Sequence, residues 1–406
     1  MRILHTSDWH LGQHFMGKTR AAEHQAFFGW LIEQIGQHRV DVVLVAGDVF
    51  DTGSPASYAR ELYNTFIVEI QKTGVELVIL GGNHDSVAML GEARELLGCL
   101  NTHVIPGVLA NPADQLLVLP RQGGEAGAIL CAIPYIRPRD VLESRAGQSG
   151  TDKQQALMAA IQAHYQSLFE QAQAMRDELA LPLPIIATGH LTTVGASSSD
   201  SVRDIYIGSL EAFPAGAFPP ADYIALGHLH KGQKVAGLEH VRYCGSPLAL
   251  SFDEVGQQKQ VLLLEFAEDR LATVTPLAVP QFQPLARVRG TLAELEPLIA
   301  RAAEQAPPGQ NVWLEVTVSG DDYLSDLQSR IQQFTRELPV EVLGIRRARS
   351  EKGNSLTAQS RETLAELGPL EVFERRLAQE QLDEPLQQQL SELYRQMLVQ
   401  VQEQPA

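Results

Sequence analysis

Cysteine is scarce in this sequence, and the three present are Cys99, Cys131 and Cys244. None stands in a CxxC pair, which excludes a zinc site of the common cysteine spacing and a disulfide framework. So few thiols suit a reducing cytosol, and we expect a cytoplasmic protein. Long apolar runs are also missing, since none approaches the ~20 residues that cross a bilayer. We therefore expect no membrane segment, and Met1–His5 predicts a first strand instead of a signal peptide.

A nucleotide-binding motif of the form GxxxxGK[S/T] is absent as well, so any ATPase activity must belong to a partner. Basic charge is in short supply, because 32 Lys and Arg residues face 49 Asp and Glu residues and the net charge is −17. Such a surface repels polyanions at long range. A nucleic-acid substrate would require local basic patches, metal ions or a partner to overcome that repulsion.

Strand-like and helix-like patterns alternate through residues 1–270. Apolar runs predict strands at Arg2–Thr6, Val40–Ala46, Glu76–Leu80, His103–Ile105, Ala128–Ile133, Pro184–Thr188 and Tyr223–Leu226. Amphipathic helices are predicted after Ser54-Pro55, after Ser86 and over residues 152–179. Strands without helices then cluster at Val241–Phe252, Gln260–Phe266 and Leu271–Val274. This order indicates an α/β fold in which a β-sandwich is flanked by helices.

We predict three units, over residues 1–275, 276–348 and 349–406. Pro276, Pro280 and Pro284 mark a linker after the first unit. The second unit is a small α/β accessory domain, with strands at 286–289, 312–318 and 340–346 and helices at 292–303 and 323–338. The third is a polar connection followed by a helical segment. Its apolar stripe is Leu386, Leu390, Leu393, Met397 and Val401.

Polar residues able to bind metals follow five of the predicted strands. Ligands gather outside the carboxyl ends of strands in open α/β sheets, so these residues should lie at one edge. The residues are Asp8, His10, Asp48, Asn83, His84, His190, His228 and His230. We interpret His24, His38 and His164, which fall within helix patterns, as surface histidines.

The mixture of imidazole, carboxylate and amide ligands predicts a transition-metal site. Mn2+, Fe2+ and Zn2+ accept this mixture better than Ca2+ or Mg2+, which prefer oxygen alone. Residues two apart point the same way, so Asp8 with His10 and His228 with His230 can each converge. One metal would have too many ligands, whereas two metals sharing Asp48 would use them all. Two cations ~3.5–4 Å apart are the usual device for in-line displacement at phosphorus.

The motifs resemble those of the calcineurin-like metallophosphoesterases. They are Ser7-Asp8-x-His10, Gly47-Asp48-x-x-Asp51, Gly82-Asn83-His84-Asp85, Gly189-His190 and Gly227-His228-x-His230. More narrowly, nearly the whole chain resembles the SbcD family of bacterial nuclease subunits. That likeness is carried by Thr6–Gly12, Gly47–Tyr58, Gly189–Ala196, Asp204–Gly208, Tyr243–Glu254 and Val372–Ala378.

The resemblance implies a two-metal DNA nuclease with Mn2+ as the expected metal. Such a nuclease is a double-strand exonuclease and a single-strand and hairpin endonuclease. It acts on duplex ends, hairpins and single strands in DNA repair, recombination and replication. Its implied partner is SbcC, a large coiled-coil ATPase. The implied assembly is a homodimer, through the helices after Ser54 and Ser86, that forms a heterotetramer with SbcC.

The resemblance also implies roles for the site residues. One metal would be held by Asp8, His10, Asp48 and His230. The other would be held by Asp48, Asn83, His190 and His228. His84 would not bind metal but would face the scissile phosphate, where a metal-activated water attacks. Asp51 would either orient His84 or approach DNA, and the motif leaves both roles open.

Two other functions remain as alternatives. The first is a phosphoprotein phosphatase or a small-molecule phosphodiesterase. Thr52 stands where phosphoprotein phosphatases place a phosphate-binding arginine, which counts against the former. The second is a non-catalytic scaffold of a repair complex, which an intact ligand set disfavours. Candidate DNA contacts are Arg137, Arg139, Arg203, Lys231, Lys234, Arg346, Arg347 and Arg349.

Overall fold

Two six-stranded sheets lie at the centre of the computed structural model, which describes residues 1–142, 149–197, 202, 212–319, 327–348, 390 and 394. The first has the order β14-β13-β1-β4-β5-β6 and the second the order β11-β12-β10-β9-β8-β7. The first sheet comprises β1 (Arg2–Thr6), β4 (Val42–Val45), β5 (Glu76–Leu80), β6 (Thr102–Ile105), β13 (Gln260–Ala267) and β14 (Arg270–Ala278). The second comprises β7 (Leu116–Pro120), β8 (Ala126–Cys131), β9 (Ile185–His190), β10 (Tyr223–Gly227), β11 (Gln233–Val235) and β12 (Leu238–Tyr243).

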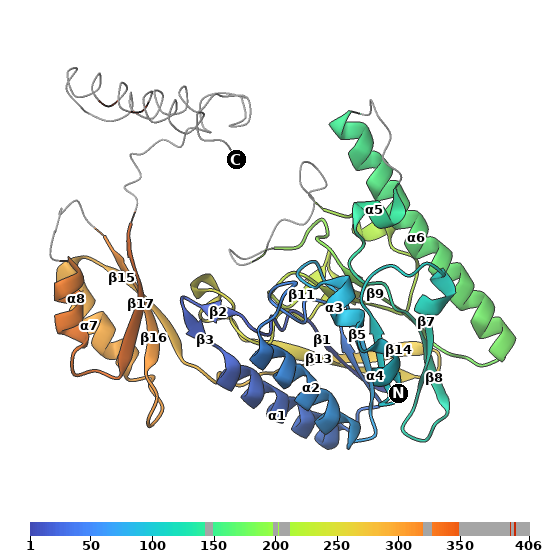
Figure 1. The fold of residues 1–406 in the computed structure, drawn as a ribbon, viewed down its shortest axis with the longest axis horizontal. Helices are drawn as coiled ribbons and strands as arrows, with labels where there is room; N and C mark the ends of the chain where they lie inside the picture. Colours follow the sequence, from blue (N-terminus) through green and yellow to red (C-terminus); the bar gives the residue numbers. More distant parts are fainter. Residues whose placement is uncertain are drawn as a thin grey trace.

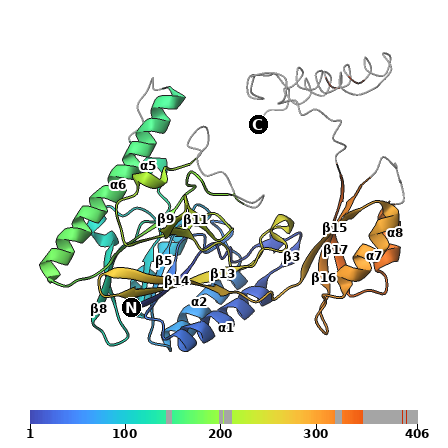
Figure 2. The same cartoon turned by 180° about the vertical axis from the view of Figure 1, so that it is seen from behind.

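Helices cover the outer faces of both sheets (Figures 1 and 2). The helices α1 (Ala21–His38) and α2 (Ser57–Gln71) pack on the first sheet, and α6 (Gly150–Leu179) packs on the second. Alternate side chains of β4 explain the layering. Val43 and Val45 face α1 and α2, whereas Val42 and Leu44 enter the core between the sheets. The predicted β-sandwich flanked by helices is therefore confirmed.

The parallel strands bring the predicted site residues to one edge. In the first sheet β1, β4, β5 and β6 run parallel, and in the second β8, β9, β10 and β12 do so. The antiparallel pairs lie toward the ends of the sheets, where β13 pairs with both β1 and β14. The carboxyl ends of β1, β4, β5, β9 and β10 consequently meet, and the loops that follow them share one space.

Several local features differ from the sequence-based expectations. The strand expected at Val241–Phe252 ends at Tyr243, and Phe252 begins a short 3-10 helix. The helix expected after Ser86 is divided into α3 (Val87–Gly91) and α4 (Arg94–Gly98). Glycine has a low helix propensity, and α3 ends at Gly91. Pro276, expected in a linker, lies in β14. This is an edge strand, where a missing backbone donor is tolerated.

His24 is fully buried, so its interpretation as a surface histidine is wrong. Its Nε2 lies 2.7 Å from the carbonyl oxygen of Trp9, and burial lowers its pKa to about 4.

A second, smaller sheet follows the sandwich. It has the order β15 (Leu285–Gly290), β16 (Val312–Val318) and β17 (Val340–Arg347), all parallel. The helices α7 (Leu292–Ala303) and α8 (Leu327–Thr335) cover the face that points away from the sandwich (Figure 1). The other face meets the hairpin of β2 (His14–Phe15) and β3 (Lys18–Thr19), where Phe15 stacks on Trp313 with ring centroids 5.7 Å apart.

The predicted C-terminal helical segment lies outside the described residues, apart from Leu390 and Tyr394, which are helical. Within the described part of the chain, no helix combines the length and the apolarity needed to cross a membrane.

Candidate metal centre

The structure gathers the predicted metal ligands into adjoining groups. Possible ligand atoms of Asp8, His10 and His230 lie within 4.8 Å of one another, and so do those of Asp48, His190 and His228. A further overlapping group joins His10, Asp48 and His84. Asn83 belongs to the same space, because its Oδ1 lies 2.8 Å from Nε2 of His190 and 3.2 Å from Nδ1 of His228.

Unusual backbone conformations aim these side chains at the centre. Asp8, His10, Asp48 and His228 all have positive φ, at 54°, 48°, 50° and 96°. Such strain costs about 1–3 kcal/mol per residue and persists only where the surroundings impose it. Two loop-to-loop bonds do so here. The N–H of Asp8 donates to the carbonyl of Gly47 at 3.0 Å, and that of His10 to the carbonyl of Asp48 at 3.1 Å.

Glycines allow these loops to approach closely. A Cβ at Gly47, which has a φ of +92°, would lie 2.3 Å from Nδ1 of His190. One at Gly227 would lie 1.9 Å from the carbonyl oxygen of Ala46. Packing thus requires a glycine before both Asp48 and His228, and at Gly47 the positive φ requires it as well.

Three of the proposed ligand histidines are held through Nδ1. His10 Nδ1 lies 3.1 Å from Oδ1 of Asp51, and His190 Nδ1 donates to the carbonyl of Ala46 at 2.9 Å. His230 Nδ1 lies 3.4 Å from a carboxylate oxygen of Glu254. Holding Nδ1 in this way fixes the ring and leaves Nε2 for a cation.

Nε2 of His10 shows that the residues present fit a metal. It is buried and has no hydrogen-bond partner among the described residues, although it lies 3.7 Å from Oδ2 of Asp48. A buried nitrogen left in this state is costly in an ordinary core but is the expected state of a cation ligand. The donor set of imidazole nitrogens and carboxylate oxygens suits a divalent transition metal.

The charges at the centre are strongly interdependent. Burial opposes ionisation of Asp48, but His190, whose Nε2 is 3.1 Å away, outweighs it and holds the pKa of Asp48 well below its usual range. Burial likewise opposes the charged form of His190, yet Asp48 raises the pKa of His190 to about 9. A cation that binds between these groups must displace the proton on His190.

His84 differs from the other histidines of the centre because it is partly exposed, whereas they are buried. Its backbone N–H donates to Oδ1 of Asp48 at 2.9 Å, and its Nδ1 donates to the backbone carbonyl of Asp51 at 2.7 Å. The ring is therefore anchored at the mouth of the centre, with its centroid 4.7 Å from that of His10. Asp51 thus contacts His84 through its main chain and His10 through its carboxylate, a division that the motif alone did not predict.

Sequence reasoning missed two buried carboxylates. Asp85 accepts hydrogen bonds from the N–H groups of Val49, Phe50 and Gly82 at 3.1, 2.9 and 2.8 Å. It therefore ties the Asp48 loop to the Asn83 loop, and burial together with the charge of Asp48 raises its pKa to about 6. Glu254 is the second. Its only sequence signal was its place at the end of the stretch Tyr243–Glu254.

This centre, at the edge of a helix-flanked double sheet, defines a phosphoesterase of the calcineurin-like class. Residues 1–232 match the family described as calcineurin-like phosphoesterase, and residues 281–381 match the family described as type 5 capsule protein repressor C-terminal domain. The chain is 56% identical to the SbcD subunit of nuclease SbcCD from Escherichia coli (strain K12), over 97% of each chain.

More distant relatives carry the same name. Identity is 32% to the SbcD subunit of nuclease SbcCD from Rhodobacter capsulatus, over 88% of this chain and 90% of that one. It is 29% to the corresponding protein of Bacillus subtilis, over 80% and 81%. The chain belongs to the SbcD family of calcineurin-like nuclease subunits, as the motifs predicted.

Proposed function

We propose that this chain is the metal-dependent nuclease subunit of an SbcCD-type complex and hydrolyses phosphodiester bonds in DNA. The observation that carries the proposal is the position of Asp48, which adjoins both His10 and His190 and belongs to both proposed ligand sets. The names of the relatives support DNA as substrate and SbcC as partner. The direct test is cleavage of linear, hairpin and single-stranded DNA with Mn2+ or Mg2+, with and without SbcC. If none of these DNA substrates is cleaved under any of these conditions, the proposal is contradicted.

The ligands are proposed as two sets that share Asp48. Asp8, His10, Asp48 and His230 would hold one cation, and Asp48, Asn83, His190 and His228 the other. When bound, two divalent cations, with Mn2+ expected, supply Lewis acidity and a water of lowered pKa. The chain's own residues hold the scissile phosphate in reach, and His84 stabilises its charge or protonates the leaving oxygen. In the cell we expect a cytoplasmic, nucleoid-associated enzyme of DNA repair, recombination and replication.

An arginine-bearing face of the small sheet offers the local positive charge that a net charge of −17 requires. Arg287 and Arg346 flank the buried carboxylate of Glu315, each with Nε at 2.9 Å. Arg289 is exposed two residues beyond Arg287, on the same face by strand alternation. This face lies opposite α7 and α8 and next to the sandwich (Figure 2). We propose the unit of residues 276–348 as a capping domain that contacts the DNA backbone.

Replacing Arg289 with alanine should weaken DNA binding about equally for all sequences. Removal of one phosphate contact should lower the slope of log affinity against log salt by ~1. Arg289 tests charge alone, because removing Arg287 or Arg346 would also leave Glu315 poorly compensated. Fluorescence anisotropy across a salt series measures the effect. Arg301→Ala is the matched control, since Arg301 is exposed on α7 on the opposite face. An unchanged slope for Arg289→Ala would exclude this face.

The other basic candidates are less available. The Arg137 guanidinium donates to the carbonyl of Asp85 at 3.0 Å and lies over the Tyr135 ring, 5.3 Å from its centroid. Lys234 pairs with Glu239. These contacts indicate structural roles, whereas Arg203 and Arg349 lie outside the described residues.

We propose that residues 349–406 carry the site for SbcC, as an amphipathic helix laid into a groove of the partner. Deleting residues 360–406 should abolish co-purification with SbcC and any ATP-stimulated cleavage of duplex ends. Mn2+-dependent cleavage of single-stranded DNA should be spared, because the proposed ligands all lie before this segment. Full affinity of the truncated chain for SbcC would contradict the proposal.

We also propose a homodimer through α2 and the α3–α4 region, and hence a heterotetramer with SbcC. A groove of about 440 Å3 lies there, lined in part by Arg60, Tyr63 and Met89. Leu97, in the second of these regions, is buried in the core of its own chain and is therefore no free contact for a partner. Leu96 is 67% exposed beside it, so Leu96→Asp should weaken the dimer without unfolding the chain. Sedimentation measures this, with Val68→Asp on the exposed side of α2 as a second probe. A wild-type monomer at micromolar concentration would end the proposal.

A further inference from the structure

His230 is held from behind by a carboxylate that is not among the proposed metal ligands. Its Nδ1 lies 3.4 Å from Oε1 of Glu254, whose side chain is completely buried. An imidazole that donates Nδ1–H to a carboxylate keeps one tautomer and one ring orientation, and it presents Nε2 to a cation. The carbonyl of Ala46 holds His190 in the same way, on the other side of the centre.

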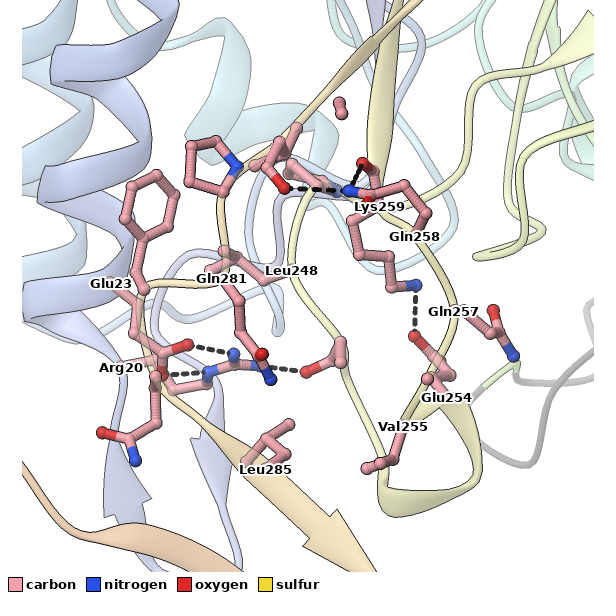
Figure 3. A pocket seen from close by; sticks show the side chains of 18 residues that line it. Arg20, Glu23, Leu248, Glu254, Val255, Gln257, Gln258, Lys259, Gln281 and Leu285 are labelled. Carbon is pink, nitrogen blue, oxygen red and sulfur yellow. Dashed lines mark hydrogen bonds and ion pairs between the residues drawn. The ribbon is translucent and has the colours of Figure 1, made fainter. Parts of the chain in front are cut away.

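Glu254 is itself fixed on its second oxygen. Oε2 accepts hydrogen bonds from the N–H of Leu250 at 3.1 Å and from Nζ of Lys259 at 2.5 Å. The residue ends a short 3-10 helix, Phe252–Glu254, so its main chain is also constrained. Lys259 and Glu254 both line a pocket of about 420 Å3, and Figure 3 shows the hydrogen bond between them as a dashed line.

Lys259 reinforces the same arrangement from another direction. Its Nζ also donates to the backbone carbonyl of His230 at 2.9 Å and to Oγ of Ser246 at 3.0 Å. An ammonium has three donors, and these bonds use all of them. One largely enclosed cation therefore fixes both the main chain of His230 and the carboxylate that orients its ring.

We infer that Glu254 is a positioning residue for metal binding, which holds the His230 imidazole toward the cation site formed with Asp8 and His10 and is itself held by Lys259. The inference rests on the proposed function, because it assumes that His230 binds metal. Glu254 lies outside the ligand motifs, yet full occupancy of the metal centre would depend on it. We also predict a defect confined to one of the two cation sites, since the histidine that Glu254 orients belongs to the first ligand set alone.

Glu254→Gln is the sharpest substitution. The amide has the shape of the carboxylate, but its NH2 group must face either the Lys259 ammonium or Nδ1–H of His230, and both are donors. One of the two hydrogen bonds must therefore break. Isothermal titration of the full-length chain with Mn2+ should then show ~10–100-fold weaker binding at one site and unchanged binding at the other. Cleavage should recover as Mn2+ is raised, with kcat restored.

Glu23→Gln is the matched control. Glu23 is a buried carboxylate that lines the same pocket, where it pairs with Arg20 instead of a metal ligand (Figure 3). A variant that merely loses a buried ion pair lowers the melting temperature, and Mn2+ affinity does not change. Glu254→Gln should change both. Glu254→Asp keeps the charge for Lys259 but withdraws it from His230, so its Mn2+ affinity should fall between those of wild type and Glu254→Gln.

Mn2+ binding by the wild-type chain tests the proposed function, and Mn2+ binding by Glu254→Gln tests the role of Glu254. A wild-type chain that binds no Mn2+ would contradict the proposed function. A wild-type chain that binds two Mn2+, with Glu254→Gln matching both affinities, would overturn only the role of Glu254. Should Glu254→Gln fail to fold by circular dichroism, Glu254→Asp decides, and wild-type affinity in that variant overturns the inference.

Discussion

Replacing His84 with alanine is expected to slow phosphodiester cleavage by ~10²–10⁴-fold while both cation sites remain filled. The ring is anchored by Nδ1 to the carbonyl of Asp51 and lies partly exposed at the mouth of the centre. It is thus placed to stabilise charge on a bound phosphate or to protonate the leaving oxygen. Single-turnover cleavage of linear duplex DNA at saturating Mn2+ measures the rate, and titration with Mn2+ counts the sites.

The control for His84 is His103→Ala. His103 lies on β6 and pairs with Glu76 at 2.6 Å, so it is a histidine bonded to a carboxylate outside the centre. Its loss should leave cleavage within a small factor of wild type. Loss of one Mn2+ from His84→Ala would make His84 a ligand and would contradict the role assigned to it.

Asp48→Asn is expected to have the largest effect of any single substitution. Asp48 is buried, lies 3.1 Å from His190 and 3.7 Å from His10, and accepts the N–H of His84. An amide keeps the shape but removes the charge that two cations would share. Metal catalysis contributes several kcal/mol, so cleavage should fall by ~10³-fold or more, and Mn2+ titration should show both sites weakened.

Asp41→Asn provides the comparison at the other end of the same strand. Asp41 precedes β4 and accepts hydrogen bonds from the backbone N–H groups of Arg2 and Gln122 at 2.7 and 3.0 Å. Its loss should affect stability and leave Mn2+ binding unchanged. Normal Mn2+ stoichiometry in Asp48→Asn would show that this carboxylate does not bridge two metals.

The sequence predicted the scaffold of the centre because that scaffold depends on local pattern. Buried parallel strands can be recognised in a sequence as short apolar runs. The residues that follow such strands lie together at the carboxyl edge of the sheet. Asp8, Asp48 and His190 are gathered for this reason. Their separate roles as ligands stay predictions, since the structure gives their proximity and not the cations.

The features that the sequence did not reveal depend on contacts between distant segments. Asp85 binds backbone groups of Val49 and Phe50, which lie more than thirty residues earlier. A lone aspartate after the Asn83-His84 pair carries no sign of that. His24 resembles any polar residue on a helix, and only the fold places it against Trp9. The helix after Ser86 had enough apolar residues to look continuous, although two short helices satisfy the same core.

Asp51 illustrates the same limit within a motif. Its spacing from Asp48 suggested either a carboxylate that orients His84 or one that approaches DNA. The structure places the main chain of Asp51 at His84 and its side chain at His10. One residue can serve both histidines in this way, and no pattern of residue types distinguishes a backbone contact from a side-chain contact.

The central claim, that two cations share Asp48, is tested most directly by anomalous X-ray diffraction from crystals of the chain soaked in Mn2+. Two anomalous peaks are expected, one on each side of the Asp48 carboxylate. One peak should adjoin Asp8, His10 and His230, and the other Asn83, His190 and His228. A single peak, or peaks that do not contact Asp48, would contradict the central claim.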